Sequence, residues 1–198
     1  MLYYMCMSKN ILLLLGHPDQ ETFSGSVADS YHVGAEDSGH NVRKLNIGEM
    51  NFDPVLHKGY KEIQPLEPDL LYFQESIRWA NHVVIVYPNW WCAMPAKLKG
   101  IFDRSWLPGF AFNFNKETKQ IEKHLTGKTG RVIILSGSHS PFSAWWHYGD
   151  YTNEIQYGIM EFAGIRTNVS SYGPTEKVDD EKRNKWLKEV ELLGKRAL

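Results

Sequence analysis

Two neighbouring tryptophans stand in a loop that directly follows an apolar run. Trp90 and Trp91 come after residues 83–87, and the four consecutive β-branched residues at 83–86 favour a strand covered on both faces. Pro88 ends this strand because it lacks a backbone donor. Open α/β sheets bind ligands at the carboxyl ends of their strands. Flat rings and free backbone N–H groups in this loop therefore predict a site for a flat aromatic ligand with polar edges.

The residues after this loop have the spacing of a helix. Pro95 suits a first helical turn, where its missing N–H costs nothing. Leu98, Ile101 and Phe102 then recur on one helical face. Strand, aromatic loop and helix in this order predict a βα unit that presents the loop at the ligand-binding edge of a sheet.

A second candidate site follows the apolar run at residues 11–15. A polar turn leads into a helix that either Thr22 or Ser24 would cap and that continues to about Asp37. Unpaired N–H groups and the helix dipole favour an anion at such an N-terminus, which predicts a phosphate site. The loop lacks the G-x-G-x-x-G glycine pattern, so a Rossmann dinucleotide site is not supported.

A third loop carries small residues at the end of another apolar run. Residues 131–135 predict a strand, and residues 136–139 form the loop at its carboxyl end, where small side chains let backbone amides approach a ligand. Gly127-Lys128-Thr129 resembles the end of a nucleotide P-loop. It precedes a strand instead of following one, and position 122 is Glu, so this interpretation is rejected.

The remaining pattern completes an alternation of strands and helices. Further strands are predicted at 41–46 and 167–172, and helices at 69–79, 157–162 and 178–196, the last with its charges on a solvated face. Five alternations predict a five-stranded parallel sheet with helices on both faces. The length favours one domain over residues 1–198, with residues 1–8 as a flexible N-terminal extension.

Composition excludes several classes of function. A net charge of -1 offers no electrostatic footprint for nucleic acid or an anionic membrane surface. No apolar run approaches the roughly 18 residues of a membrane span, so no membrane insertion is expected. Cys6 and Cys92 form neither a disulfide framework nor a metal-ligand pattern, so no metal site is predicted. Both are expected to be free thiols in a reducing, cytoplasmic setting.

The tryptophan loop also carries a family resemblance. Pro88-Asn89-Trp90-Trp91, Met94-Pro95-Ala96 and Leu98-Lys99-Gly100 with Asp103-Arg104 resemble the signature of the flavodoxin-like NAD(P)H:quinone oxidoreductases, and the likeness spans residues 9–194. The resemblance implies a flavodoxin-like three-layer α/β sandwich and a flavin cofactor, with FMN preferred for this short chain and FAD as the alternative. It also implies NAD(P)H as co-substrate, a quinone or similar acceptor, ping-pong transfer of a hydride and a homodimer.

The same resemblance assigns residues to the site. The residues it implies to contact the flavin are His17, Thr22, Phe23, Ser24, Pro88, Asn89, Trp90, Trp91, Cys92, Ser136, Gly137, Ser138 and His139. Tyr148, and after it His147, are the candidates for the family's catalytic Tyr and His, although Phe stands where the family Tyr would align. The aromatic run at 106–114 corresponds to a region that lies at the dimer interface and walls the substrate pocket in relatives.

Two other functions remain open at this point. A flavodoxin that carries single electrons would share the fold, although such carriers tend to be strongly acidic and this chain is not. Close relatives also serve as regulatory ancillary subunits of potassium-efflux systems, a role compatible with catalysis.

Overall fold

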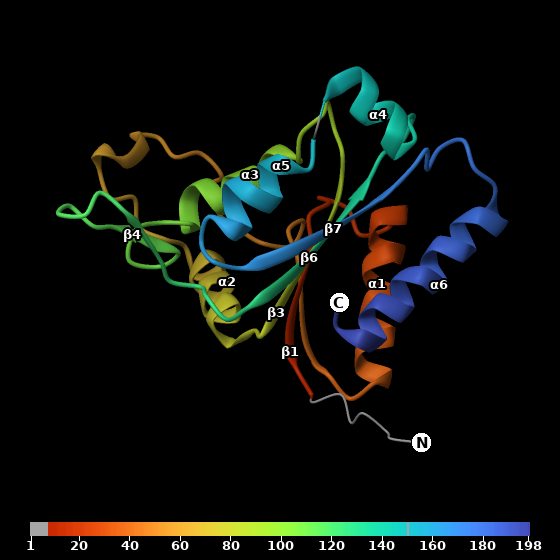
Figure 1. The fold of residues 1–198 in the computed structure, drawn as a ribbon, viewed down its shortest axis with the longest axis horizontal. Coiled ribbons are helices and arrows are strands. Elements are labelled where there is room, and N and C mark those ends of the chain that lie inside the picture. Colours follow the sequence, from red (N-terminus) through yellow and green to blue (C-terminus); the bar gives the residue numbers. More distant parts are fainter. Residues whose placement is uncertain (1–7, 150) are drawn as a thin grey trace.

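The computed structural model describes residues 8–149 and 151–198 (Figure 1). Its centre is a parallel sheet of five strands in the order β2-β1-β3-β6-β7. The strands are β1 (Asn10–Leu15), β2 (Asn41–Asn46), β3 (His82–Pro88), β6 (Thr129–Leu135) and β7 (Arg166–Tyr172). The predicted flavodoxin-like α/β fold is therefore confirmed. Cys6 and the extension predicted over residues 1–8, apart from Ser8, lie outside the described residues.

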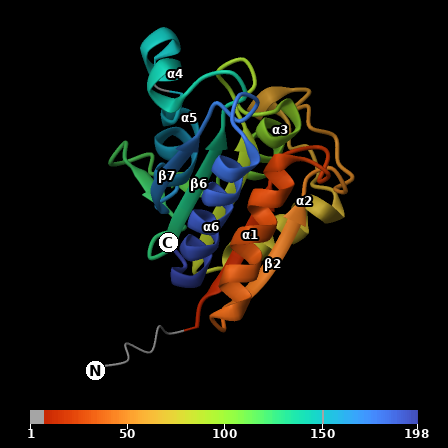
Figure 2. The ribbon, with the colours of Figure 1, turned by 90° about the vertical axis from the view of Figure 1, so that its right-hand side faces the viewer.

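Helices cover both faces of the sheet. They are α1 (Phe23–Asp37), α2 (Pro68–Trp79), α3 (Ala96–Ser105), α4 (Pro141–Tyr148), α5 (Asn153–Ile155) and α6 (Asp180–Arg196), with a 3-10 turn η1 (Gly59–Lys61) and a π-helical segment η2 (Gln156–Glu161). Helices α1 and α6 lie side by side on one face (Figure 2), while α2 and α3 lie on the other.

The strand side chains divide between two cores because successive residues point to opposite faces. Leu12 and Leu14 of β1 join the core under α2 and α3, whereas Ile11, Leu13 and Leu15 join the core under α1 and α6. Every one of these five residues is fully buried, so β1 is apolar along its whole length. A strand covered on both faces has no solvent-facing side, which is why its sequence shows no alternation.

The order of the strands creates a crevice at one edge of the sheet. The chain leaves β1 towards α1 on one face and leaves β3 towards α3 on the other, although β1 and β3 are neighbours. Such a switch point separates the two connecting loops and leaves room for a ligand between them. Gly16 permits the close approach of these elements, since a Cβ there would lie 2.7 Å from Leu98 Cδ2.

Two segments have structure that the sequence pattern did not indicate. The run 106–114 is largely packed inside, with Trp106 and Phe110 buried, and its end forms strand β4 (Phe112–Phe114), which pairs antiparallel with β5 (Ile121–Lys123). The helix expected at 157–162 begins four residues earlier as α5 and continues in π-helical form before Gly164 ends it with a φ of 101°.

Over the two described stretches, no helix is both long enough and apolar enough to cross a bilayer.

Candidate functional site

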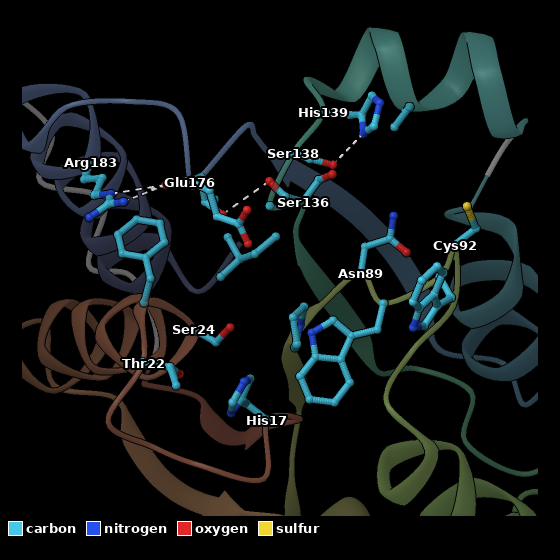
Figure 3. Close-up of a pocket in the computed structure, with 18 residues that line it drawn as sticks. His17, Thr22, Ser24, Asn89, Cys92, Ser136, Ser138, His139, Glu176 and Arg183 are labelled. Atoms are coloured by element: carbon cyan, nitrogen blue, oxygen red, sulfur yellow. Dashed lines mark hydrogen bonds between the residues drawn. The ribbon is translucent and has the colours of Figure 1, made fainter.

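A cavity of about 770 Å³ opens at the carboxyl ends of β1, β3 and β6 (Figure 3). Its size lies in the range typical of small-molecule and cofactor sites. Every residue that the resemblance implies for flavin contact lines it: His17, Thr22, Phe23, Ser24, Pro88, Asn89, Trp90, Trp91, Cys92, Ser136, Gly137, Ser138 and His139. Three loops that are distant in sequence thus meet in one place. None of the residues at 106–114 is among the residues that line this cavity.

The position of the two catalytic candidates relative to this cavity is not described. His147 and Tyr148 belong by backbone to α4, but their side chains lie outside the described part of the structure. Their proximity to a ligand stays a prediction.

The N-terminus of α1 faces the cavity and leaves donors available. Thr22, and not Ser24, is the N-cap, and its hydroxyl accepts a hydrogen bond from the Gly25 amide at 3.3 Å. The amides of Phe23 and Ser24, at the first two helical positions, have no carbonyl of the same helix to bind. Together with the helix dipole they create a site for an anion at this end of the cavity.

His17 is oriented by its own loop. The Asp19 amide donates to His17 Nδ1 at 2.9 Å, so Nδ1 is the acceptor and the neutral ring carries its hydrogen on Nε2. The ring also meets Trp90 edge-on, with centroids 5.3 Å apart. His17 therefore presents an N–H donor at the rim of the cavity, next to the aromatic loop.

The aromatic loop is a tight turn with an unusual backbone. Trp90 and Ala93 exchange two backbone hydrogen bonds of 2.9 and 3.0 Å. Trp91 and Cys92 between them both adopt positive φ, 55° and 64°, the geometry of a type I′ turn that normally takes Asn-Gly. Within the described structure their own amides have no hydrogen-bond partner. The Trp91 side chain is 99% exposed, so strained backbone and uncovered ring surface coincide at one site.

Asn89 connects this turn to the neighbouring strand. Its amide donates to the Leu135 carbonyl at 2.7 Å, and its side chain points into the cavity (Figure 3). The amide and carbonyl of that side chain are one donor group and one acceptor group, which suits a ligand with alternating polar atoms on its edge.

The loop after β6 is held by a strap formed by residues 173–176. The Thr175 amide donates to the Ser136 carbonyl at 2.9 Å, and the Glu176 amide donates to the Gly137 carbonyl at 3.0 Å. The Glu176 side chain packs closely on Gly137, since a Cβ there would lie 2.6 Å from Glu176 Oε1. Ser138 Oγ and His139 Nδ1 lie 2.7 Å apart at the other end of the loop.

Sequence analysis missed several residues that line the cavity: Leu135, Ala144, Thr175, Glu176 and Arg183. The interpretation of the α6 charges as a purely solvated face is wrong for Arg183. Helical periodicity places this residue on the outer side of α6, and only the return of the chain after β7 brings that side to the cavity.

Among the described residues, no three His, Cys, Asp or Glu side chains lie close enough together to hold a metal ion.

Comparison with known proteins identifies the chain's relatives. A protein of *Haemophilus influenzae* named "Uncharacterized NAD(P)H oxidoreductase" is 26% identical over 186 residues, 90% of each chain. "NAD(P)H dehydrogenase [quinone] 1" of *Rattus norvegicus* is 26% identical over 188 residues, 80% of this chain and 66% of that one. A solved FMN-dependent NADH-azoreductase of *Bacillus anthracis*, in complex with FMN, superposes with a TM-score of 0.72 at 22% identity over 96% of this chain and 99% of that one.

The family model described as "Flavodoxin-like fold" matches residues 9–191. That range contains the whole five-stranded sheet and every residue that lines the cavity. The chain belongs to this flavodoxin-like family, which its relatives place among the NAD(P)H oxidoreductases.

Proposed function

We propose that the protein is a flavin-dependent NAD(P)H oxidoreductase that reduces a quinone or a similar small acceptor. The observation that carries this proposal is one cavity, at the switch point of the sheet, lined by a helix N-terminus, an aromatic turn and a loop of small residues. Each of these fits a different part of a phosphorylated, flat heteroaromatic cofactor. The names of the two curated relatives support the same reaction class.

The residues present fit a flavin. The donor set at α1, with the Phe23 and Ser24 amides, suits its phosphate. The loop of Ser136, Gly137 and Ser138 suits the edge of the ring, because its small side chains let backbone amides come close to a ligand. FMN is the first choice and FAD the alternative, and the FMN complex of the structurally similar azoreductase supports the choice.

When bound, the flavin supplies hydride chemistry, taking a hydride from NAD(P)H and delivering it to the acceptor. The chain's own part is to bind and orient. The amides of Trp91 and Cys92 are available to stabilise negative charge on a ring edge in the way an oxyanion hole does. With the flavin in place, the rings of Trp90 and Trp91 would cover the same edge and exclude water from it. His147 and Tyr148 are proposed to hold a proton near it.

Sharing of this cavity by both substrates has a kinetic consequence. If NAD(P)H and the acceptor both reach the ring through this opening, the nicotinamide leaves before the acceptor enters, which is ping-pong kinetics. Initial rates at several fixed acceptor concentrations should give parallel double-reciprocal lines, whereas intersecting lines would contradict the shared site.

A homodimer is part of this proposal. Phe142, Trp145 and Trp146 on α4 are 72%, 53% and 70% exposed, a concentration of aromatic surface that water does not favour. Light scattering at micromolar concentration should give twice the chain mass. A monomer would contradict the dimer and leave the redox proposal standing.

The experiment that tests the proposed function is a visible absorption spectrum of the purified protein, before and after anaerobic NADPH and NADH. The expected result is a flavin band that bleaches with one nucleotide and returns when a quinone is added. Absence of any flavin, even after incubation with FMN and with FAD, would refute the proposal. A flavin band indifferent to both nucleotides would favour the single-electron carrier, and the ancillary-subunit role would require co-purification with a transporter.

A further inference from the structure

Four polar side chains gather on one face of the sheet, towards the end opposite to the cavity. His82 of β3 and Arg131 of β6 stand two residues before members of the core under α1 and α6, so they point to that face. His40, between α1 and β2, donates its amide to the carbonyl of Ala35 in the same core. Tyr31 of α1 belongs to this core as well. We call Tyr31, His40, His82 and Arg131 the donor cluster.

Each member of the donor cluster has a buried polar atom without a partner. These atoms are Tyr31 Oη, His40 Nε2, His82 Nε2 and Arg131 Nε, and no described residue forms a hydrogen bond with any of them. Tyr31, His40 and His82 are 0%, 5% and 1% exposed, so bulk water does not reach them. Because a buried polar group without a hydrogen bond costs free energy, the cluster points to a ligand.

The two histidines offer donors and not acceptors. The Lys9 amide donates to His40 Nδ1 at 3.2 Å, so the neutral His40 ring carries its hydrogen on Nε2. His82 Nδ1 lies 2.7 Å from Thr129 Oγ1. When the Thr129 hydroxyl donates this bond, the His82 ring also carries its hydrogen on Nε2. Both unpaired ring atoms are then N–H groups.

The other two members are donors for different reasons. Arg131 Nε carries a hydrogen whenever the guanidinium is charged, and a guanidinium has no acceptor. The Tyr31 hydroxyl keeps its proton because burial raises the pKa of this group. A water molecule brings hydrogens as well as lone pairs, so water does not remove the excess of donors. An anion brings lone pairs alone.

The charges around the cluster are positive. Burial lowers the pKa of His82 to about 3, and the charges of Lys9, Arg131 and His40 act in the same direction. Arg131 Nη1 donates to the Ser170 hydroxyl at 2.9 Å. Among the described residues, neither Lys9 nor Arg131 has a carboxylate at ion-pair distance. Such surroundings repel a metal cation and attract an anion.

We propose that the donor cluster binds a small inorganic anion of the size of chloride. Arg131 supplies the charge, and the uncharged donors of Tyr31, His40 and His82 complete the site. Because these three side chains are almost fully buried, the site excludes bulky and organic anions. The proposal is independent of the flavin, since the cavity lies at the other end of the strands.

The role of this anion is structural. Lys9, whose charge acts on His82, donates from Nζ to the Ala197 carbonyl at 3.1 Å, just beyond the last residue of α6 (Figure 1). Tyr31 belongs to α1. An anion among these groups joins both helices to the sheet, so it should stabilise the folded chain.

The test compares thermal unfolding of the full chain in sodium chloride and in sodium gluconate, at equal ionic strength and neutral pH. Gluconate is too large for an enclosed site, and His82 is neutral at this pH. A ligand that binds only the folded state raises Tm with its concentration. At a chloride concentration about tenfold above Kd, Tm should be about 3–5 °C higher than in gluconate.

Two variants locate the effect. Tyr31→Phe removes one hydroxyl and keeps the ring, so it should reduce the difference between the two salts by about half or more. In gluconate it should not lower Tm, because the hydroxyl has no partner to lose. Arg131→Gln removes the charge and should abolish the difference.

Tyr87→Phe is the matched control. Tyr87 is also buried, 1% exposed, but it belongs to the core on the other face of the sheet. This variant should keep the full difference between chloride and gluconate. General effects of salt act on all variants alike, so they do not imitate the expected pattern.

Crystals grown in bromide give a second measurement, with an anomalous peak expected within the donor cluster. Three outcomes would overturn the proposal: equal Tm of the wild type in both salts, a difference that Tyr31→Phe leaves undiminished, or an equal loss in Tyr87→Phe. Absence of bromide from the cluster would overturn it as well. If Arg131→Gln fails to fold, Tyr31→Phe and the bromide crystals still decide.

Discussion

The two ends of strand β3 lead into opposite kinds of structure. At its amino end, His82 is 1% exposed and its Nδ1 lies 2.7 Å from Thr129 Oγ1 on the neighbouring strand. Lys128 closes the same edge by donating to the Ala80 carbonyl. At its carboxyl end, the chain enters a turn with two left-handed residues and a fully exposed Trp91.

The difference separates stability from binding. At the amino end, the polar groups named above mostly have partners inside the protein, although His82 Nε2 is buried without one. At the carboxyl end, amides and ring surface are left for a ligand, and the backbone is held in a conformation that costs free energy. Backbone strain and unpaired polar groups are expected where a binding site is preorganised. In this protein both lie at the carboxyl end of β3, one strand length from the His82 end.

The largest expected effect concerns the amino end. Burial, reinforced by the positive charges of Lys9 and Arg131, lowers the pKa of His82 from 6.5 to about 3. Between these values the unfolded chain binds a proton that the folded chain does not, so the free energy of unfolding falls as the pH decreases below 6.5. At about 1.4 kcal/mol per pKa unit, the contribution reaches several kcal/mol in acid.

His82→Gln should flatten this dependence. Urea unfolding of both proteins at neutral pH and near pH 4 measures it, and the variant should lose several kcal/mol less than the wild type. His124→Gln, which replaces an exposed histidine, provides the control. Identical pH profiles for His82→Gln and the wild type would show that the amino end is not closed as described.

The next effect concerns the turn at the carboxyl end. The double substitution Trp91→Asn with Cys92→Gly places the residues that a type I′ turn prefers. Because left-handed backbone costs roughly 1–2 kcal/mol per ordinary residue, the free energy of unfolding should rise by about 1–2 kcal/mol. Loss of the Trp91 ring should weaken flavin binding about fivefold, because stacking of aromatic rings contributes about 1 kcal/mol.

Cys92→Gly alone separates the two contributions. It relaxes half of the turn and keeps both tryptophans, so it should stabilise the protein without a comparable loss of affinity, as measured by urea unfolding and fluorescence titration. A double variant that is less stable than the wild type would refute the idea that strain is stored at this end.

The smallest effect is expected on α3, away from both ends of β3. Lys99 and Asp103 form an i,i+4 ion pair on α3, with side chains 44% and 39% exposed. Exposed pairs of this kind contribute about 0.5 kcal/mol or less. Lys99→Gln should change the free energy of unfolding by no more than that and should leave flavin affinity unaltered. A larger effect would mean that the helix behind the turn transmits strain to the site.

The sequence was most informative where a pattern reports local physics. Residues 11–15 and 83–86 are apolar without interruption because both of their faces are covered, and this is visible in the residue types alone. The three loops of the cavity follow such runs directly, so their meeting at one edge of a parallel sheet was predictable. The N-cap was predictable to within two alternatives, of which Thr22 is correct.

Patterns failed where a residue's neighbours come from distant parts of the chain. The aromatic run at 106–114 gave no sign of the β4–β5 hairpin at its end, because strand β5 contains only exposed residues. Trp106 is buried elsewhere, against Phe73 of α2 and Phe102 of α3. The π-helical segment after α5 has the same periodicity signal as an ordinary helix over so few residues.

What residue types alone determined is the layered fold, the edge of the sheet at which the cavity opens, and the family. Only the tertiary structure decided which side chains from distant parts of the chain also line the cavity at that edge. Arg183 lies on the polar side of an amphipathic helix, and nothing in helical periodicity distinguishes it from its solvated neighbours. Its place beside Phe23 depends on how α6 packs on α1 and on a carbonyl of the strap at Thr175. Those are contacts of tertiary structure, and periodicity reports only which face of a helix a residue occupies.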